Sequence, residues 1–292
     1  MKGYIMLIRP HQWVKNLFIF LPVFFGGHLL EWHYMVPALI TFAAYCFVAG
    51  SIYCFNDIHD READRQHPKK RLRPVASGRV SVRSGYVLMA VMLLSAMAVI
   101  FQLPAGDRLK VSAVIFCYYA MNIAYCVRLK RIALVDVFVI ATGFVLRIVV
   151  GGLATHIALS HWIVLMTFLL ALFLALAKRR DDVVIYEETG VKPRSNILRY
   201  NLSFLNQAIS IIASVTMVCY IMYTVSEEVI SRMGSNLLYA TSVFVLAGIM
   251  RYLQLTIVDA KSGSPTRILL KDRFMQGCIF GWIMSFCMIL YI

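Results

Sequence analysis

The sequence predicts an all-α membrane protein with nine transmembrane helices in a single domain, residues 1–292. Hydrophobic residues make up 60% of the chain, and the mean hydropathy is +0.73. Apolar runs recur with lengths near the ~20 residues that cross a bilayer as a helix. Lys and Arg gather between alternate runs. A soluble protein of this size can form its core with a much smaller fraction of apolar residues, so the composition favours a membrane-embedded chain.

Nine apolar stretches carry this prediction. The first is short and contains Pro22, so we expect a tilted or kinked helix there. No convincing small-residue cleavage site follows it, which favours a retained helix over a signal peptide. The expected spans are 17–31, 34–55, 84–103, 110–127, 133–154, 160–177, 206–226, 235–257 and 274–292.

The basic residues predict the orientation. With the N-terminus in the cytoplasm, the inside segments hold 25 of the 29 Lys and Arg residues, as the positive-inside rule requires. The net charge of +14 therefore indicates membrane topology and not a nucleic-acid partner. The inside segments are 1–16, 56–83, 128–132, 178–205 and 251–273.

The seven cysteines lie within or at the ends of the expected spans, and none forms a CxxC pair. We expect small apolar packing residues, with no disulfide and no zinc.

The segment "NDIHDREAD" follows the second span. Asn56, Asp57, Asp60 and Asp64 have spacings that place them on one helical face. Carboxylates stacked in this way repel one another, and a hard cation offsets that cost. Mg²⁺ commonly takes one or two carboxylates together with phosphate oxygens. We therefore expect Mg²⁺ at these four residues.

A basic run follows, and it includes Arg71 and Arg73. Taken alone, this run is typical of a positive-inside segment that stops membrane insertion and contacts anionic lipid. Beside metal-binding carboxylates, guanidinium groups suit the remaining oxygens of a diphosphate. The two features together predict a Mg²⁺–diphosphate site at the cytoplasmic membrane surface.

"NDIHDREAD" resembles the first NDxxDxxxD signature of the UbiA superfamily of intramembrane prenyltransferases. The resemblance implies a nine-helix bundle around a cytoplasm-facing cavity. "IRPHQWVKNLFIFLPVFF", "HPKKRLRPVASG", "YCVRLKRIALVDVFVIATGFVLRIVVGG" and "SPTRILLKDR" resemble its decaprenyl-phosphate phosphoribosyltransferase branch. That branch implies phosphoribosyl pyrophosphate as donor, a polyprenyl phosphate as acceptor and the inner membrane of a bacterium.

The sequence departs from the quinone-type enzymes after the sixth span. Where they carry a second acidic motif, this chain has Lys178 and Arg179 ahead of Asp182. Lys178 and Asp182 are four residues apart and can share a helix face. A cationic second site suits further phosphate better than a second metal, although Asp181, Asp182 or Glu187 as ligands to a second metal stays open.

Asp136 and Arg147 are ionisable residues within the fifth span. They lie about 16 Å apart along a helix, too far to pair. Such residues face a cavity or a partner. A substrate role and a structural contact are both open for them, and Asp136 is also placed to orient Lys130, Arg131 or the metal shell.

Tyr125 and Lys130 occupy the region where the resemblance implies a Tyr and a Lys beside the diphosphate. Both residues also have simpler explanations: Tyr125 can anchor a helix end at the membrane interface, and Lys130 can be a positive-inside charge. Arg9, Gln12, Lys15 and Asn16 are candidates for capturing the lipid phosphate, or form an amphipathic surface helix. The segment before the last span contains Thr266 and Arg267, and positive-inside charge explains its basic residues. The resemblance implies a structural or site-closing role for Asp272.

The expected reaction is glycosyl transfer at ribose C1. Asp57, Asp60, Asp64 and Lys130 are the expected catalytic residues, and the acceptor phosphate is already anionic, so no strong base is needed. One alternative is a prenyltransferase that joins an isoprenoid diphosphate to an aromatic acceptor. A second, of another class, is a membrane transporter with Asp136 and Arg147 on its path. The oligomeric state, including a homo-oligomer, is left open by the sequence.

Overall fold

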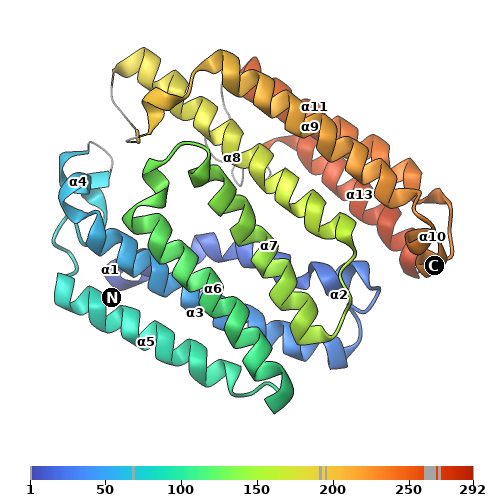
Figure 1. Cartoon of the computed structure of the whole chain (residues 1–292), viewed down its shortest axis with the longest axis horizontal. Helices are drawn as coiled ribbons and strands as arrows, with labels where there is room; N and C mark the ends of the chain where they lie inside the picture. The colour runs from blue at the N-terminus through green and yellow to red at the C-terminus, as the bar shows by residue number, and fades with distance from the viewer. Residues whose placement is uncertain are drawn as a thin grey trace. The chain divides into compact units, whose positions relative to one another are not determined.

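The computed structural model describes residues 2–67, 70–190, 193–194, 196–259, 268 and 271–291. Every regular element in that part of the chain is a helix (Figure 1). The α-helices are α1 (Lys2–Ile8), α2 (Leu21–Phe25), α3 (Trp32–His59), α4 (Arg61–Gln66), α5 (Val82–Ile100), α6 (Ala105–Val127), α7 (Val135–Thr155), α8 (His161–Thr189), α9 (Leu202–Thr224), α10 (Glu227–Met233), α11 (Ser242–Ile257) and α13 (Arg273–Tyr291). The 3₁₀ helices are η1 (Pro10–Phe20), η2 (Lys70–Leu72), η3 (Leu129–Arg131), η4 (Ile197–Arg199) and η5 (Leu237–Thr241).

The chain forms two compact units. The first comprises residues 1–130 and 143–159, and the second comprises residues 131–142 and 160–292. The helix α7 contributes its first residues to the second unit and the rest to the first. A single membrane domain over residues 1–292 stays a prediction.

The first unit is built around α3. This helix packs against α5, α6, α1 and η1. Its core includes Ala44, Tyr45, Val48 and Ile52 of α3, and residues of η1, α5, α6 and α7 pack around them. Small residues on α3 let neighbouring helices approach closely, as is usual in membrane bundles.

The second unit is built on α8, which lies alongside α9, while α11 packs against both α9 and α13 (Figure 1). Arg180 of α8 ties three of these helices together. Its Nη1 donates to the Thr256 carbonyl at 2.6 Å, its Nη2 to the Ile257 carbonyl at 3.2 Å, and its Nε to Asn206 Oδ1 at 2.8 Å. The guanidinium thus satisfies carbonyls at the C-terminal end of α11, where intrahelical donors run out.

Seven helices in the described residues are long and apolar enough to cross a bilayer. The protein is therefore a multi-pass membrane protein, but the expected count of nine is not confirmed. The last expected span is a shorter apolar helix, Arg273–Ile289. The first, 17–31, is not one kinked helix. The 3₁₀ helix η1 runs to Phe20, and Pro22 lies in the first turn of a new short helix, where its missing N–H costs no hydrogen bond.

Candidate active site

The "NDIHDREAD" signature lies where α3 ends. The expectation of one continuous helical face for Asn56, Asp57, Asp60 and Asp64 is wrong, because α3 ends at His59 and α4 begins at Arg61. Asp60 lies between the two helices with φ −87° and ψ 2°. The Asp60 N–H still donates to the Asn56 carbonyl at 2.9 Å, and the Asp64 N–H donates to the Asp60 carbonyl at 2.8 Å. The junction is therefore nearly helical, but it turns the carboxylates toward different partners.

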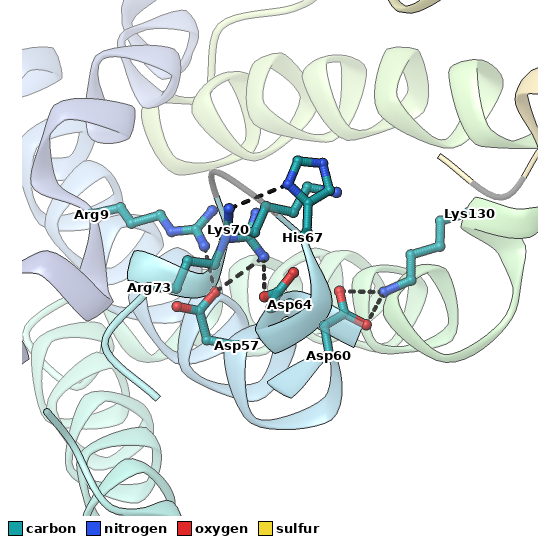
Figure 2. A network of polar contacts seen from close by, with 8 residues as sticks. All are labelled: Arg9, Asp57, Asp60, Asp64, His67, Lys70, Arg73 and Lys130. Atoms are coloured by element: carbon teal, nitrogen blue, oxygen red, sulfur yellow. Dashed lines mark hydrogen bonds and ion pairs between the residues drawn. The ribbon is translucent and has the colours of Figure 1, made fainter. Parts of the chain in front are cut away.

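Asp57 is the most enclosed of the three carboxylates, with a side chain 1% exposed. Its Oδ1 accepts a hydrogen bond from Arg9 Nη2 and lies 3.7 Å from Arg73 Nη1. The same Arg73 nitrogen donates to Asp64 Oδ2 at 2.7 Å. Figure 2 shows the two guanidinium groups converging on Asp57, with Arg73 between Asp57 and Asp64.

Asp60 takes a separate cation. Lys130 Nζ donates to both of its carboxylate oxygens, at 2.6 and 2.7 Å. Lys130 lies in η3, seventy residues further along the chain, and Figure 2 shows the pair set apart from the Asp57 group. Three carboxylates are thus matched by three cations, which offsets part of the cost of holding charge away from water.

A short apolar cluster positions Arg73. The segment after η2 buries Val75 and Val80 against Leu7 of α1 and against Cys54 and Ile58 of α3. The Val80 N–H donates to the Pro74 carbonyl at 3.0 Å and closes this segment into a compact turn. Arg73 stands at its entrance, so burial of two valines places the guanidinium beside the end of α3.

The donors present fit a magnesium ion. Asp57 Oδ2 is buried and has no hydrogen-bond partner among the described residues, and a carboxylate oxygen of this kind suits a hard divalent cation. Across the described ranges, no three His, Cys, Asp or Glu side chains come together as a metal site. The fit is therefore to an ion held by one or two carboxylates with substrate oxygens, and not to an all-protein cage.

Other residues expected in this site have ordinary surroundings. Asn56 is half-buried, and Arg71 is exposed and forms no ion pair with described residues. Tyr125 packs partly buried against the core of the first unit. Gln12 and Lys15 lie half-buried on η1, whose N-cap residue is Arg9. Lys69 of the basic run lies outside the described residues.

Arg147 is buried inside the first unit, and each of its three side-chain nitrogens donates a hydrogen bond there. Its Nε donates to Asn16 Oδ1 at 2.9 Å, its Nη1 to the Gly143 carbonyl at 2.7 Å, and its Nη2 to Tyr118 Oη at 2.8 Å. The guanidinium also lies over the rings of Tyr45, Tyr118 and Phe144, between 4.8 and 5.3 Å from their centroids. This is the structural-contact alternative for Arg147.

The second unit has its own buried ionic cluster. Arg179 Nε donates to Asp136 Oδ2 at 2.6 Å, and both side chains are 0% exposed. Tyr200 Oη donates to Asp136 Oδ1 at 2.8 Å and accepts from the Leu134 N–H at 2.7 Å. Asp136 therefore orients Arg179, and not Lys130 or Arg131 as the sequence suggests.

Asp182 pairs with neighbours other than the expected one. Its Oδ2 accepts from Arg179 Nη1 at 3.2 Å and from Arg194 Nε at 2.8 Å. Lys178 is exposed and forms no ion pair with described residues. The Arg179 Nη2 atom is buried without a hydrogen-bond partner in the described part of the chain.

The sequence does not predict Tyr200 and Arg194 as members of this cluster. Neither belongs to a motif, and their partners lie 64 and 12 residues away, so no spacing rule connects them. Burial raises the pKa of the Tyr200 hydroxyl above its ordinary value. Tyr200 therefore stays protonated and keeps donating to Asp136.

Asp272 has a structural partner. Arg251 Nη2 donates to Asp272 Oδ2 at 2.7 Å, and the Met275 N–H donates to Asp272 Oδ1 at 2.9 Å. The Arg251 hydrogen bond, followed by that of Met275, holds the pKa of Asp272 below its usual value. The pair joins α11 to the start of α13, which fits the structural half of the expectation. Thr266 and Arg267 lie outside the described residues.

The sequence profile of the UbiA prenyltransferase family matches residues 19–282. A decaprenyl-phosphate phosphoribosyltransferase from Mycolicibacterium smegmatis is 32% identical over 291 residues, covering 96% of this chain and 90% of the relative. A protein of the same name from Corynebacterium glutamicum is 30% identical, covering 99% of this chain and 87% of the relative. A 4-hydroxybenzoate octaprenyltransferase from a Polaromonas species is 27% identical over 64% of this chain and 63% of its own.

Solved structures share the fold. A UbiA homolog from Archaeoglobus fulgidus, bound to GPP and Mg²⁺, superposes with a TM-score of 0.69 at 18% identity, covering 99% of this chain and 100% of that one. The structure of the same homolog with DMAPP and Mg²⁺ gives a TM-score of 0.68 at 18% identity and 99% coverage of both chains.

Proposed function

Because the chain belongs to the UbiA prenyltransferase family, we propose that this membrane transferase moves 5-phosphoribose from phosphoribosyl pyrophosphate to a polyprenyl phosphate and releases pyrophosphate. The observation that carries the proposal is the set of three carboxylates and three cations at the end of α3. Relatives named for this reaction align over nearly the whole chain. The finer choice of donor and acceptor rests on those names and on the chemistry below.

Asp57, with Asp64 or Asp60, would hold Mg²⁺, which would supply positive charge to the oxygens of the departing pyrophosphate. The chain's own cations add to that charge. Arg9, Arg73 and Lys130 already lie at the carboxylates, and their N–H groups suit pyrophosphate oxygens as well as they suit carboxylate oxygens. These groups are charged before the donor arrives, so they need little reorganisation as the bond breaks.

The acceptor needs little activation. A polyprenyl phosphate oxygen is anionic near neutral pH and attacks ribose C1 as the C1–O bond to pyrophosphate breaks. Both electrons of that bond leave with the pyrophosphate, and the new C1–O bond forms to the lipid phosphate. No proton has to be removed from the nucleophile, so no general base is required. Exclusion of water by the bilayer-embedded helices limits hydrolysis of the donor.

Further phosphate binding is proposed for the second unit. Arg179 has a buried Nη2 without a described partner, and Lys178 is exposed beside it in sequence. Gln12 and Lys15 of η1 stay candidates for the lipid phosphate, with Trp13 between them. We further propose that the N-terminus and the α3–α4 junction face the cytoplasm of a bacterium, as the basic residues predict.

The direct test is a transfer assay with purified protein in detergent or vesicles. It uses Mg²⁺, phosphoribosyl pyrophosphate labelled in the ribose, and polyprenyl phosphates of several lengths. Label should enter the lipid phase in proportion to pyrophosphate released, and EDTA should stop it. Label that never enters the lipid phase contradicts the proposal.

An aromatic prenyltransferase is the second candidate. It is favoured by the octaprenyltransferase relative and by the isoprenoid diphosphates in the solved neighbours. The same preparation with an isoprenyl diphosphate and 4-hydroxybenzoate decides between them. Alkylation of the aromatic acid without phosphoribosyl transfer establishes this alternative. Turnover of either donor excludes a transporter as the whole function.

A further inference from the structure

Arg147 is a buried cation that the proposed chemistry does not use. Its three nitrogens all donate within the first unit, and its side chain lies among three aromatic rings. These bonds engage every guanidinium nitrogen, and the residue is only 6% exposed, so Arg147 is poorly placed to bind a phosphate. Its role must therefore be sought in what its partners hold.

The link that matters leads to η1. Arg147 Nε donates to Asn16 Oδ1, and Asn16 Nδ2 in turn donates to Cys46 Sγ of α3 at 3.2 Å. Asn16 is 1% exposed. A Cβ on Gly151 would collide with the Ile19 carbonyl oxygen, so η1 and α7 meet backbone to backbone one turn further along. These contacts fix η1 between α3 and α7.

The other end of η1 is Arg9. This residue is the N-cap of the helix and has φ 51° and ψ 62°, a left-handed conformation that is unfavourable for a non-glycine residue. It precedes Pro10, which further limits its backbone. Asn16 lies seven residues away, about 14 Å along a 3₁₀ helix. An anchor at Asn16 therefore decides where the Arg9 backbone lies.

Arg9 carries that placement to the site. Its guanidinium donates to Asp57 Oδ1 and lies 5.0 Å from the centroid of the Tyr53 ring. We infer that Arg147 is a positioning residue: through Asn16 it fixes η1, and η1 holds Arg9 against Asp57. This inference rests on the proposed function only for its link to transfer. The positioning claim itself requires only that the native protein binds Mg²⁺–pyrophosphate.

The test is a double-mutant cycle between Asn16 and Arg9. Binding of Mg²⁺–pyrophosphate is measured by titration calorimetry, and kcat and KM are measured in the transfer assay. Arg9→Met should weaken Mg²⁺–pyrophosphate binding by about 10- to 100-fold, as the loss of a hydrogen bond from a charged group predicts. Asn16→Leu should weaken it in the same direction. The double variant should bind as Arg9→Met does, within about twofold, because both changes remove one contribution.

Two further variants separate positioning from general damage. Asn16→Asp keeps an acceptor for Arg147 and should retain near-native binding. Thr41→Val removes a buried hydroxyl with no described hydrogen-bond partner in the same unit and should bind as the native protein does. If Asn16→Leu does not give folded protein, Arg147→Lys takes its place in the cycle.

Three results overturn the inference: losses that multiply in the double variant, native binding in folded Asn16→Leu, or no Mg²⁺–pyrophosphate binding by the native protein. The native protein could bind Mg²⁺–pyrophosphate and give the expected double-mutant result, yet transfer no phosphoribose. That outcome contradicts the proposed function but not the positioning role of Arg147. Calorimetry thus tests the positioning role of Arg147, and the transfer assay tests the proposed function.

Discussion

At the scale of single residues, the site depends on how charge is buried. Asp57 is enclosed and shares two guanidinium groups, whereas Asp60 is partly exposed and has Lys130 to itself. Loss of a buried charge leaves its partners uncompensated, and this destabilises a fold far more than loss of an exposed one. The two aspartates should therefore respond differently to substitution.

Asp60→Asn should lower transfer by at least about 100-fold, the size of effect seen when one electrostatic contact to a transition state is removed. The melting temperature in detergent should stay close to native, because Asp60 and Lys130 are both partly exposed. The matched control is Glu62→Gln, an exposed carboxylate on α4 that pairs with Arg61 and Arg65. Near-native transfer by folded Asp60→Asn would count against the site.

Asp272 supplies a pH prediction. Its pKa is lowered in the folded protein, so its pair with Arg251 stabilises the fold above about pH 4, and this contribution is lost as pH falls through the lowered pKa. Arg251→Met should therefore melt below the native protein at neutral pH, and the two curves should converge in acid. Arg128→Met, which removes an exposed cation, serves as control. A constant difference across the pH range would exclude this account.

At the scale of elements, sequence reasoning succeeds where one helix decides the outcome. The long apolar helices α3, α7, α8 and α9 lie at their expected places because hydropathy over twenty residues is a local signal. The prediction of the first span was wrong because an eleven-residue 3₁₀ helix is followed by a new helix, α2, with Pro22 in its first turn. Nothing in apolar composition distinguishes 3₁₀ from α geometry.

The meeting of η1 and α7 gives an element-level prediction. Gly151→Ala places a Cβ into the Ile19 carbonyl, and backbone cannot yield as a flexible side chain can. The expected loss is roughly 1–3 kcal/mol of unfolding free energy, the usual cost of overpacking. Gly106→Ala in α6 is the control, since nothing lies within 4 Å of its Cβ. Denaturant titration in mixed micelles compares them, and equal stabilities would show that η1 can move away.

At the scale of the whole molecule, the sequence predicts which residue types form the candidate site. It does not predict which carboxylate pairs with which cation. The sequence predicts Asp57, Asp60 and Asp64 as site residues because they lie within one short motif. Two of their three cations, Arg9 and Lys130, come from positions 48 and 70 residues distant, which only tertiary packing brings near. The third, Arg73, lies nine residues from Asp64 in the basic run that follows the signature. For the same reason the sequence found Asp136 and Arg179 but not the Tyr200 that joins them.

The orientation of the protein in the membrane is a prediction about the whole molecule. Ser77→Cys, an exposed position after η2, should react with a membrane-impermeant maleimide in inside-out vesicles only. Gln102→Cys, exposed between α5 and α6, should react in right-side-out vesicles only. The native protein gives the background from its own cysteines. Reversal of the two patterns would place the carboxylates on the opposite side of the membrane.

The even match of acids and bases at the end of α3 bears on the order in which ligands arrive. A lone divalent ion would leave these side chains with surplus positive charge, and a lone diphosphate would leave surplus negative charge, each in surroundings that screen poorly. A metal chelate of the donor's diphosphate brings less charge imbalance to these side chains than either component. Loading should therefore favour the preformed chelate, and free magnesium by itself should bind weakly.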